Sequence, residues 1–232
     1  GDTSFSYSAA RYCKKPVCST FDGGFAVLGT RSYSPSLPKF ISKFDSLGEL
    51  QWTQLVEGIR GNDAEAIVQT SDSGFVMGGD TILIKLDCIG NLLWGRTLME
   101  DWTIQDLTAR NDGGISATIF KTSEPTVLIN FNSSGNLQWA RYVSDTFTTA
   151  FCHLINGPNE GYISVGYGIT IGEFENDGNS CLAGSYTTIG IEEFTPTVIG
   201  ASLDVDSLSG SVSTIEPYNV DTCEVWNRNL CP

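Results

Sequence analysis

Short apolar runs alternate with polar turn residues along this chain of 232 residues. The clearest stretch, residues 82–94, reads ILIKLDCIGNLLW, in which two apolar runs flank a turn that contains an aspartate and a glycine. Runs of β-branched and aliphatic residues bounded by such turn residues are typical of β-hairpins. No window of eleven residues has apolar positions at the three-and-four spacing of an amphipathic helix. The pattern therefore predicts an all-β protein made of short strands.

Two short sequence motifs, which we call phrases, recur along the chain. The first has the form Asp/Asn-x-x-Gly-x-Leu-x-Trp, and its turn glycines Gly48, Gly90 and Gly135 lie 42 and 45 residues apart. Such a period indicates repeated β-units. In the second phrase, one or two glycines follow an acidic or amide residue and precede an apolar run. This phrase comes before each copy of the first phrase and occurs once more after the last copy. Its four copies lie at residues 22–29, 72–79, 112–115 and 159–166.

Four short strands at a period of about 40–45 residues are typical of a propeller blade, because a twisted sheet buries both faces only when neighbours stack around an axis. We predict one disulfide-stapled β-propeller domain over residues 1–232, with four blades of four antiparallel strands and an enlarged last blade. Residues 197–204 are expected to resume the last blade after an insertion. The predicted blades are about 7–57, 64–99, 104–144 and 149–216, with the insertion at 169–194 and a C-terminal tail at 217–232.

The recurring Trp52, Trp94 and Trp139 occupy one fixed position of the repeat. A large apolar side chain at the same place in each unit favours packing between blades over a role in ligand binding. The fourth copy has residues 212–215, VSTI, at this position.

The two phrases together resemble the repeats of secreted and surface β-propeller proteins described as quinoprotein-like or delta-60-type. The resemblance covers about residues 20–168. It implies an extracellular propeller module used for display or adhesion, and it implies no quinone cofactor, because no stretch matches the binding residues of the quinoprotein dehydrogenases.

Composition and charge narrow the classes of function. The chain is 41% hydrophobic and 17% charged, with a formal net charge of −14. Such an acidic surface repels nucleic acid phosphates, so no nucleic acid partner is expected. No run of 18 apolar residues occurs, so no membrane span is expected, and residues 1–4 look like a mature terminus after removal of a leader. These features favour an extracellular or cell-surface protein.

Seven cysteines occur without the paired spacing of zinc sites, and a disulfide framework in an oxidising compartment is the stronger interpretation. The two terminal pairs either close locally or cross over to join the ends, and a third bridge is expected between the last blade and its insertion. The odd thiol, Cys88, lies in a turn phrase and is either an intermolecular bridge or a free thiol. The disulfide candidates are Cys13, Cys18, Cys152, Cys181, Cys223 and Cys231.

Asn132 begins an N-glycosylation sequon in another turn phrase, which makes it a glycan candidate in a secreted protein. The single histidine, His153, follows Cys152 in a predicted strand, where adjacent side chains point to opposite faces, so the two cannot form a nucleophile–base pair. No catalytic, cofactor-binding or metal site is predicted. Calcium is the one alternative, because residues 173–177 and 204–206 carry oxygen ligands, although neither segment matches a known calcium motif.

Three functions follow from these observations. The first is a secreted, non-enzymatic structural protein that assembles with itself, as the subunit of an extracellular polymer or fibre, or with other extracellular proteins or glycans. The second is a carbohydrate- or protein-binding propeller of the lectin or adhesin kind, with Tyr167, Tyr186 or Trp102 stacking on sugar rings. The third is a propeller-type hydrolase with acidic residues across a central channel.

Overall fold

The computed structural model describes residues 16–30, 39–57, 66–99, 102–121, 124–143, 151–166, 170–178, 183–185, 189–193 and 195–201. Within this part of the chain the strands form four antiparallel sheets, so the protein is all-β as predicted. In three of the sheets, four consecutive strands are joined by a fifth strand from the region after residue 182.

The strands follow the repeats of the sequence. The first sheet has the order β1 (Val17–Ser19), β2 (Phe25–Thr30), β3 (Lys39–Phe44), β4 (Leu50–Glu57) and β18 (Thr197–Ala201). The second has the order β5 (Ala66–Gln69), β6 (Phe75–Gly79), β7 (Ile82–Leu86), β8 (Leu92–Leu98) and β17 (Ile191–Glu193). The third has the order β9 (Thr103–Ala109), β10 (Ile115–Phe120), β11 (Val127–Phe131), β12 (Leu137–Val143) and β16 (Ala183–Ser185). The fourth contains β13 (Phe151–Asn156), β14 (Tyr162–Gly166) and β15 (Thr170–Phe174), with a short 3₁₀ turn, η1 (Pro158–Glu160), between β13 and β14.

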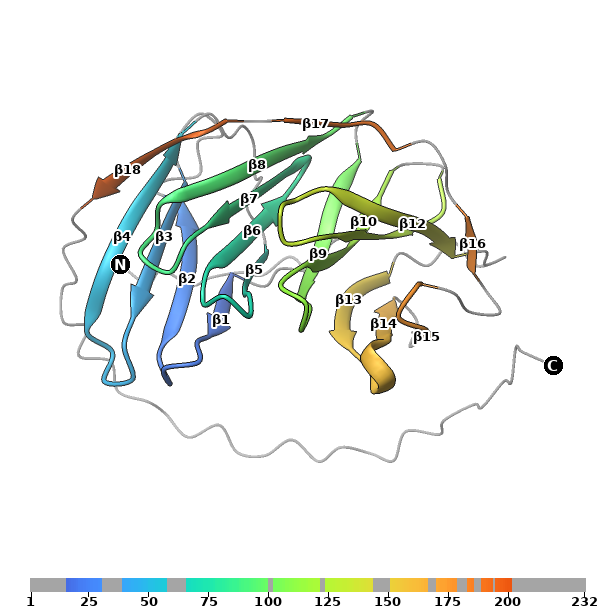
Figure 1. Ribbon diagram of the computed structural model, residues 1–232, viewed down its shortest axis with the longest axis horizontal. Coiled ribbons are helices and arrows are strands. Elements are labelled where there is room, and N and C mark those ends of the chain that lie inside the picture. Colours follow the sequence, from blue (N-terminus) through green and yellow to red (C-terminus); the bar gives the residue numbers. More distant parts are fainter. Residues whose placement is uncertain are drawn as a thin grey trace, which may run out of the picture.

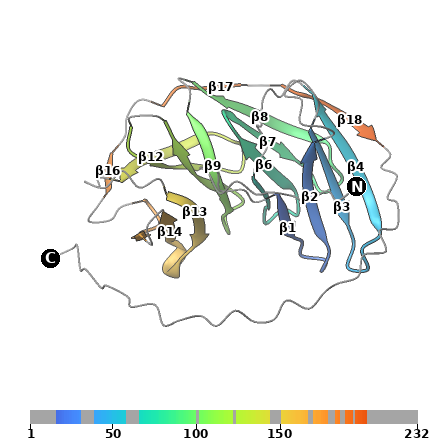
Figure 2. The same ribbon diagram turned by 180° about the vertical axis from the view of Figure 1, so that it is seen from behind.

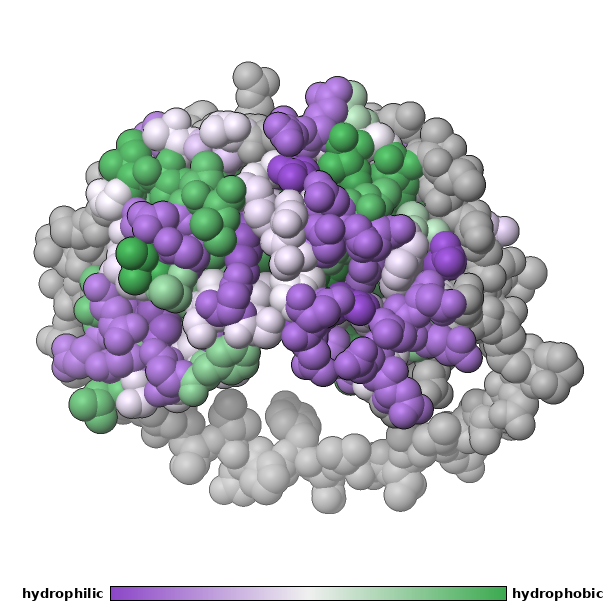
Figure 3. Space-filling view, in the orientation of Figure 1, coloured by the Kyte–Doolittle hydropathy of each residue, from purple (hydrophilic) through white to green (hydrophobic). Residues whose placement is uncertain are grey.

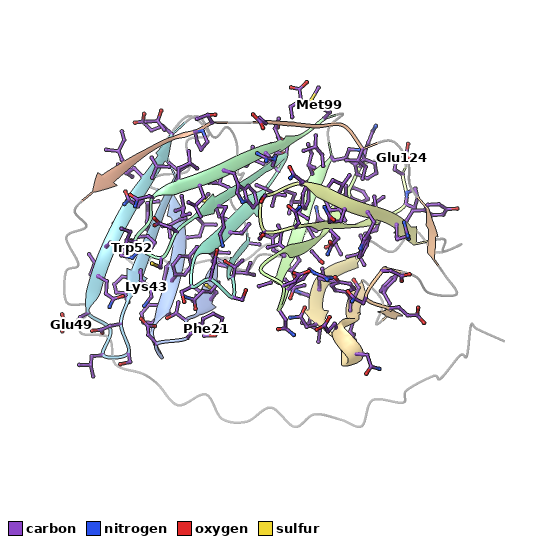
Figure 4. The ribbon with its side chains drawn as sticks, in the orientation of Figure 1. Phe21, Lys43, Glu49, Trp52, Met99 and Glu124 are labelled. Atoms are coloured by element: carbon purple, nitrogen blue, oxygen red, sulfur yellow. The ribbon has the colours of Figure 1, made fainter. Side chains whose placement is uncertain are left out.

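The sheets lie side by side like a fan (Figure 1). The first strands of successive sheets touch one another, β1 against β5, β5 against β9 and β9 against β13. The fourth strands β4, β8 and β12 lie towards the outside, and β16, β17 and β18 run along this outer rim in both views (Figures 1 and 2). The short turns meet at one end of the sheets, where Phe21 and Glu49 lie, whereas Met99 and Glu124 lie at the opposite end (Figure 4).

The hydrophobic core consists of three clusters, each between two neighbouring sheets. The second sheet is buried on both faces, since every residue of β6 and β7 is buried. This explains why residues 82–84 read as a continuous apolar run instead of alternating with polar residues. On the face of the molecule that Figure 3 shows, apolar side chains gather in separate patches divided by polar bands.

The turns between the third and fourth strands share one geometry. In the first sheet, Asp45 Oδ1 accepts hydrogen bonds from the backbone N–H groups of Leu47 and Glu49 at 2.8 and 2.9 Å, and Gly48 has a φ of 83°. Asp87 and Asn132 make the equivalent bonds in the next two sheets. One extra residue follows each turn on the fourth strand, just before the tryptophan, and forms a β-bulge.

The predicted role of the tryptophans in packing between units is confirmed. Trp52 of the first sheet meets Phe75 of the second edge-on at 5.6 Å between ring centroids. The Trp94 indole donates to the Ser133 carbonyl of the third sheet at 3.0 Å. Trp139 of the third sheet lies 6.0 Å from the ring of Tyr162 in the fourth.

The predicted boundaries of the last unit are wrong at two places. Residues 197–201 do not resume the fourth sheet, because β18 pairs with β4 of the first sheet. The predicted insertion 169–194 contains β15 of the fourth sheet and then β16 and β17, which belong to the third and second sheets. The chain leaves the fourth sheet early because the free edges of β12, β8 and β4 offer unpaired backbone groups along the rim. Residues 202–232, including the predicted tail, lie outside the described residues.

Candidate functional site

The outer rim is the candidate functional site. We call the three strands β16, β17 and β18 together the strap. It runs backwards past the sheets, pairing antiparallel with β12, then β8, then β4. Three strands that lie close together in the sequence thus each complete the outer edge of one sheet.

The register of the strap brings specific residues face to face. Glu193 of β17 lies opposite Arg96 of β8, and Thr197 of β18 lies opposite Glu57 of β4. Opposite charges at directly facing positions stabilise a strand pair, and like charges destabilise it. The Arg96–Glu193 position therefore favours the observed register of β17.

Of the side chains that the structure describes in and beside the strap, at residues 189–193 and 195–200, few are buried. Val198 is half-buried against the core of the first two sheets, and Ile189 and Ile191 are half-buried against the core of the second and third. Pro196 is buried, whereas Ile199 is 44% exposed. Backbone pairing therefore contributes a large share of the attachment of the strap.

A cleft of about 330 Å³ lies between β17 and the neighbouring turn of the third sheet. Its walls include one guanidinium group and two carboxylates. The guanidinium is held on one side, because Arg96 donates to the carbonyls of Gly135 and Ser134 at 2.8 and 3.0 Å. The cleft shows that β17 is not closely packed where it crosses between the sheets; its lining residues are Arg96, Gly135, Asn136, Leu137, Ile189, Ile191, Glu192 and Glu193.

A second polar feature repeats at the turns between the first and second strands. The Lys85 ammonium, almost fully buried, donates to the carboxylate of Asp72 at 2.7 Å and to the hydroxyl of Thr70. Burial acts to raise the pKa of Asp72, but the hydrogen bonds from Lys85, Thr70 and the Gly74 N–H outweigh it and hold this pKa below its ordinary value.

The same cation–carboxylate pair occurs in the first sheet and, rearranged, in the third. Hydrogen bonds from Lys43, its closest contact being 2.8 Å, hold the pKa of Asp22 well below its ordinary value. In the third sheet the cation comes instead from Arg110, two residues before Asp112, and its hydrogen bonds lower the pKa of that carboxyl. Asn130 occupies the lysine position there. These pairs are repeated structural elements of the fold.

The structure also brings together Asp106 of β9 and His153 of β13, which the sequence analysis did not connect. Their closest nitrogen–oxygen distance, from His153 Nδ1 to Asp106 Oδ2, is 3.7 Å, and the carboxylate is buried while the imidazole is half exposed. Asp106 also accepts from the Leu154 N–H at 2.9 Å, so it joins the third and fourth sheets.

The structure describes three of the seven cysteine positions. Cys18 of β1, a predicted disulfide partner, is instead a free thiol, and Cys88 is also free and is exposed in its turn as expected. Burial raises the pKa of the Cys18 thiol to about 11. Cys152 lies in β13, and the remaining candidates Cys13, Cys181, Cys223 and Cys231 lie outside the described residues.

Asn132 lies in an exposed turn as predicted, but its side chain already has a structural role. Its Oδ1 accepts from the backbone N–H groups of Ser134 and Asn136 at 3.1 and 3.0 Å. A glycan attaches through the amide nitrogen, so the sequon remains a candidate for modification.

The predicted sugar-stacking role of Trp102 is wrong, because its side chain is fully buried. Tyr167 and Tyr186 lie outside the described residues, as do residues 204–206 of the calcium alternative. In the described ranges no group of three or more His, Cys, Asp or Glu side chains is placed to hold a metal ion. The same ranges contain no helix long and apolar enough to cross a membrane.

No protein-family profile and no curated protein sequence matches this chain. A solved structure of a protein of unknown function from Bacteroides caccae is similar to it, with a TM-score of 0.48 and 10% sequence identity. The similarity covers 71% of this chain and 58% of that one, so this chain spans less than two thirds of that protein.

Proposed function

We propose that this protein is a secreted, non-enzymatic structural protein that assembles with copies of itself outside the cell. The observation that carries the proposal is the rim, where strands from a distant segment complete three sheet edges by backbone pairing. An edge that accepts an added strand from its own chain is equally able to accept one from another chain.

We further propose that the four sheets are the blades of a four-bladed propeller. The successive contacts of β1, β5, β9 and β13 support this arrangement, as does the core cluster between each neighbouring pair. In such a ring the first strands surround the axis and the strap lies on the outside, where it is accessible to a second molecule.

Exposed apolar residues support association over a purely monomeric existence. At the turn end of the first two sheets, Phe21, Leu47 and Ile89 are 70%, 85% and 63% exposed. Cys88 precedes Ile89 and is also exposed, which supports a covalent contact between copies in an oxidising compartment. The net charge of −14 opposes association at low ionic strength, so salt is expected to promote it.

The test is electron microscopy and light scattering of protein produced through a secretory pathway and never reduced. We expect particles larger than the monomer whose size rises with protein and salt concentration. The variant Cys88→Ser separates covalent from noncovalent contacts, because noncovalent assembly survives it. Monomers at every concentration and salt condition, for wild type and variant alike, would show that the protein does not assemble.

A further inference from the structure

We propose that the strap is exchanged between copies, so that β17 and β18 of one chain pair with β8 and β4 of the next. This inference rests on the proposed function and names the segment and the partner that would produce the assembly. The partner is a second copy of this chain, because it carries the same edges, with the register and the facing residues that the strap already pairs with.

The edges of β4 and β8 require a strand. They are eight and seven residues long, and without the strap each presents a row of unpaired N–H and C=O groups. Exposed edges of this length recruit other strands. When the strap of one copy leaves, an edge is therefore available to the strap of another.

The strap is only lightly packed against its own sheets. Val198 and Ile191 are only half-buried, Glu192, Glu193 and Thr197 are exposed, and the cleft of about 330 Å³ lies beside β17. The backbone hydrogen bonds and side-chain packing that the strap makes on its own edges form again on the same edges of a second copy. Exchange of an identical element between copies therefore costs little, and the balance is set by the connecting segment and the protein concentration.

The spacing of the strap strands indicates which part moves. Only three residues, 194–196, separate β17 from β18, and they include the buried Pro196. Five residues, 186–190, separate β16 from β17. We therefore expect β17 and β18 to move together, because they are the closer pair along the chain, and β16 to stay on its own sheet. If each copy gives its strap to one neighbour and receives one from another, the result is a ring where the rotation between copies closes and an open chain where it does not.

Facing positions in β18 and β4 provide a direct test. Thr197 and Glu57 face each other and are both exposed, so both tolerate charge changes. The variant T197E places like charges face to face within one chain, and so does the double variant E57K/T197K. When the two variants are mixed, every exchanged pair instead has opposite charges. The double variant E57K/T197E has opposite charges within one chain and between chains, and controls for folding.

The two variants also differ in net charge, which by itself favours mixed association. A second pair with the same net charges, S46E and S46K/E49K, places the changes on exposed side chains of the turn between β3 and β4, outside the positions that pair with β18. Native mass spectrometry of isotopically labelled mixtures then counts mixed and unmixed oligomers for both pairs. Circular dichroism of each variant confirms that it folds.

If the strap is exchanged, the ratio of mixed to unmixed oligomers should be roughly tenfold higher for the strap pair than for the turn pair. The reason is that two facing pairs change from like to opposite charge in the mixed oligomers of the strap pair. An equal ratio for the two pairs would overturn the exchange. If wild-type oligomers form in that case, the proposed assembly stands and the strap is not its cause. If wild-type protein stays monomeric while the strap pair forms mixed oligomers, the exchange stands and the proposed function fails.

Discussion

Replacing the turn glycines by alanine measures how much stability the docking of one sheet on the next contributes. Gly48 and Gly135 occupy the same turn position, with φ angles of 83° and 74°. A Cβ at Gly48 meets nothing within 4 Å, whereas a Cβ at Gly135 lies 2.8 Å from the ring of Trp94. The two replacements therefore share the backbone cost of a left-handed conformation and differ in the docked tryptophan.

The expected losses follow from these contacts. Gly48→Ala lowers the free energy of unfolding by about 1–2 kcal/mol, the cost of a Cβ at positive φ. Gly135→Ala adds about 1–3 kcal/mol of overpacking, because the Trp94 ring must shift. That shift also weakens the indole hydrogen bond to the Ser133 carbonyl, which contributes about 1 kcal/mol. Gly135→Ala should therefore destabilise the protein by about 1–4 kcal/mol more than Gly48→Ala.

Urea unfolding followed by tryptophan fluorescence and far-ultraviolet circular dichroism provides the assay, with the slope m compared among variants to confirm a common transition. A double-mutant cycle with Trp94→Leu adds a second criterion. Once the ring is removed, Gly135→Ala should cost no more than Gly48→Ala. Equal losses for the two glycines in the wild-type background would refute the conclusion that docking of Trp94 stabilises the junction.

Three further predictions concern the polar groups. Asp72→Asn leaves the buried Lys85 ammonium without its carboxylate and should lower the free energy of unfolding by about 2 kcal/mol. The loss is smaller than for a fully buried pair because Asp72 is 50% exposed. Adding Lys85→Met to Asp72→Asn should restore part of the lost stability, as measured by thermal unfolding. Asp72 and Asp112 have pKa values below the ordinary value. The stability that these two carboxylates contribute is therefore complete above about pH 4 and is lost as the pH falls below this value. The urea midpoint should decline in this way between about pH 7 and pH 2.5, and Asp72→Asn should make the decline shallower. At pH 8 iodoacetamide should label the exposed Cys88 and spare Cys18, whose thiol pKa of about 11 keeps it protonated; rapid labelling of Cys18, detected by peptide mass spectrometry, would contradict its burial.

The repeat spacing predicted the strands of the first three sheets well, because hairpins are specified by residues close together in sequence. The apolar runs and turn glycines lie within one unit, and the first four strands of each of these sheets pair with their neighbours in the chain. The fourth copy of the turn was missed because it lacks the leucine and tryptophan that follow the others. Its signal was present, since Gly178 lies 43 residues after Gly135, four residues after Phe174, and has a positive φ of 76°.

The strap and the Asp106–His153 pair were not predictable in the same way. Strap pairing depends on backbone groups, which every residue carries, so residues 183–201 contain no pattern that names β12, β8 and β4 as partners. Asp106 and His153 are 47 residues apart and meet only because β9 and β13 are in contact. No local phrase links them.

The amino-acid sequence by itself determined the all-β class, the repeated unit, the geometry of its turns and the packing role of its tryptophans, because these depend on φ preferences, hydrogen bonds and burial within or between adjacent units. Only the tertiary structure decided where residues 183–201 go and which polar groups meet between sheets. The physical reason is that unpaired sheet edges accept any strand that reaches them, so the choice is made by the distances and directions that the packed sheets impose.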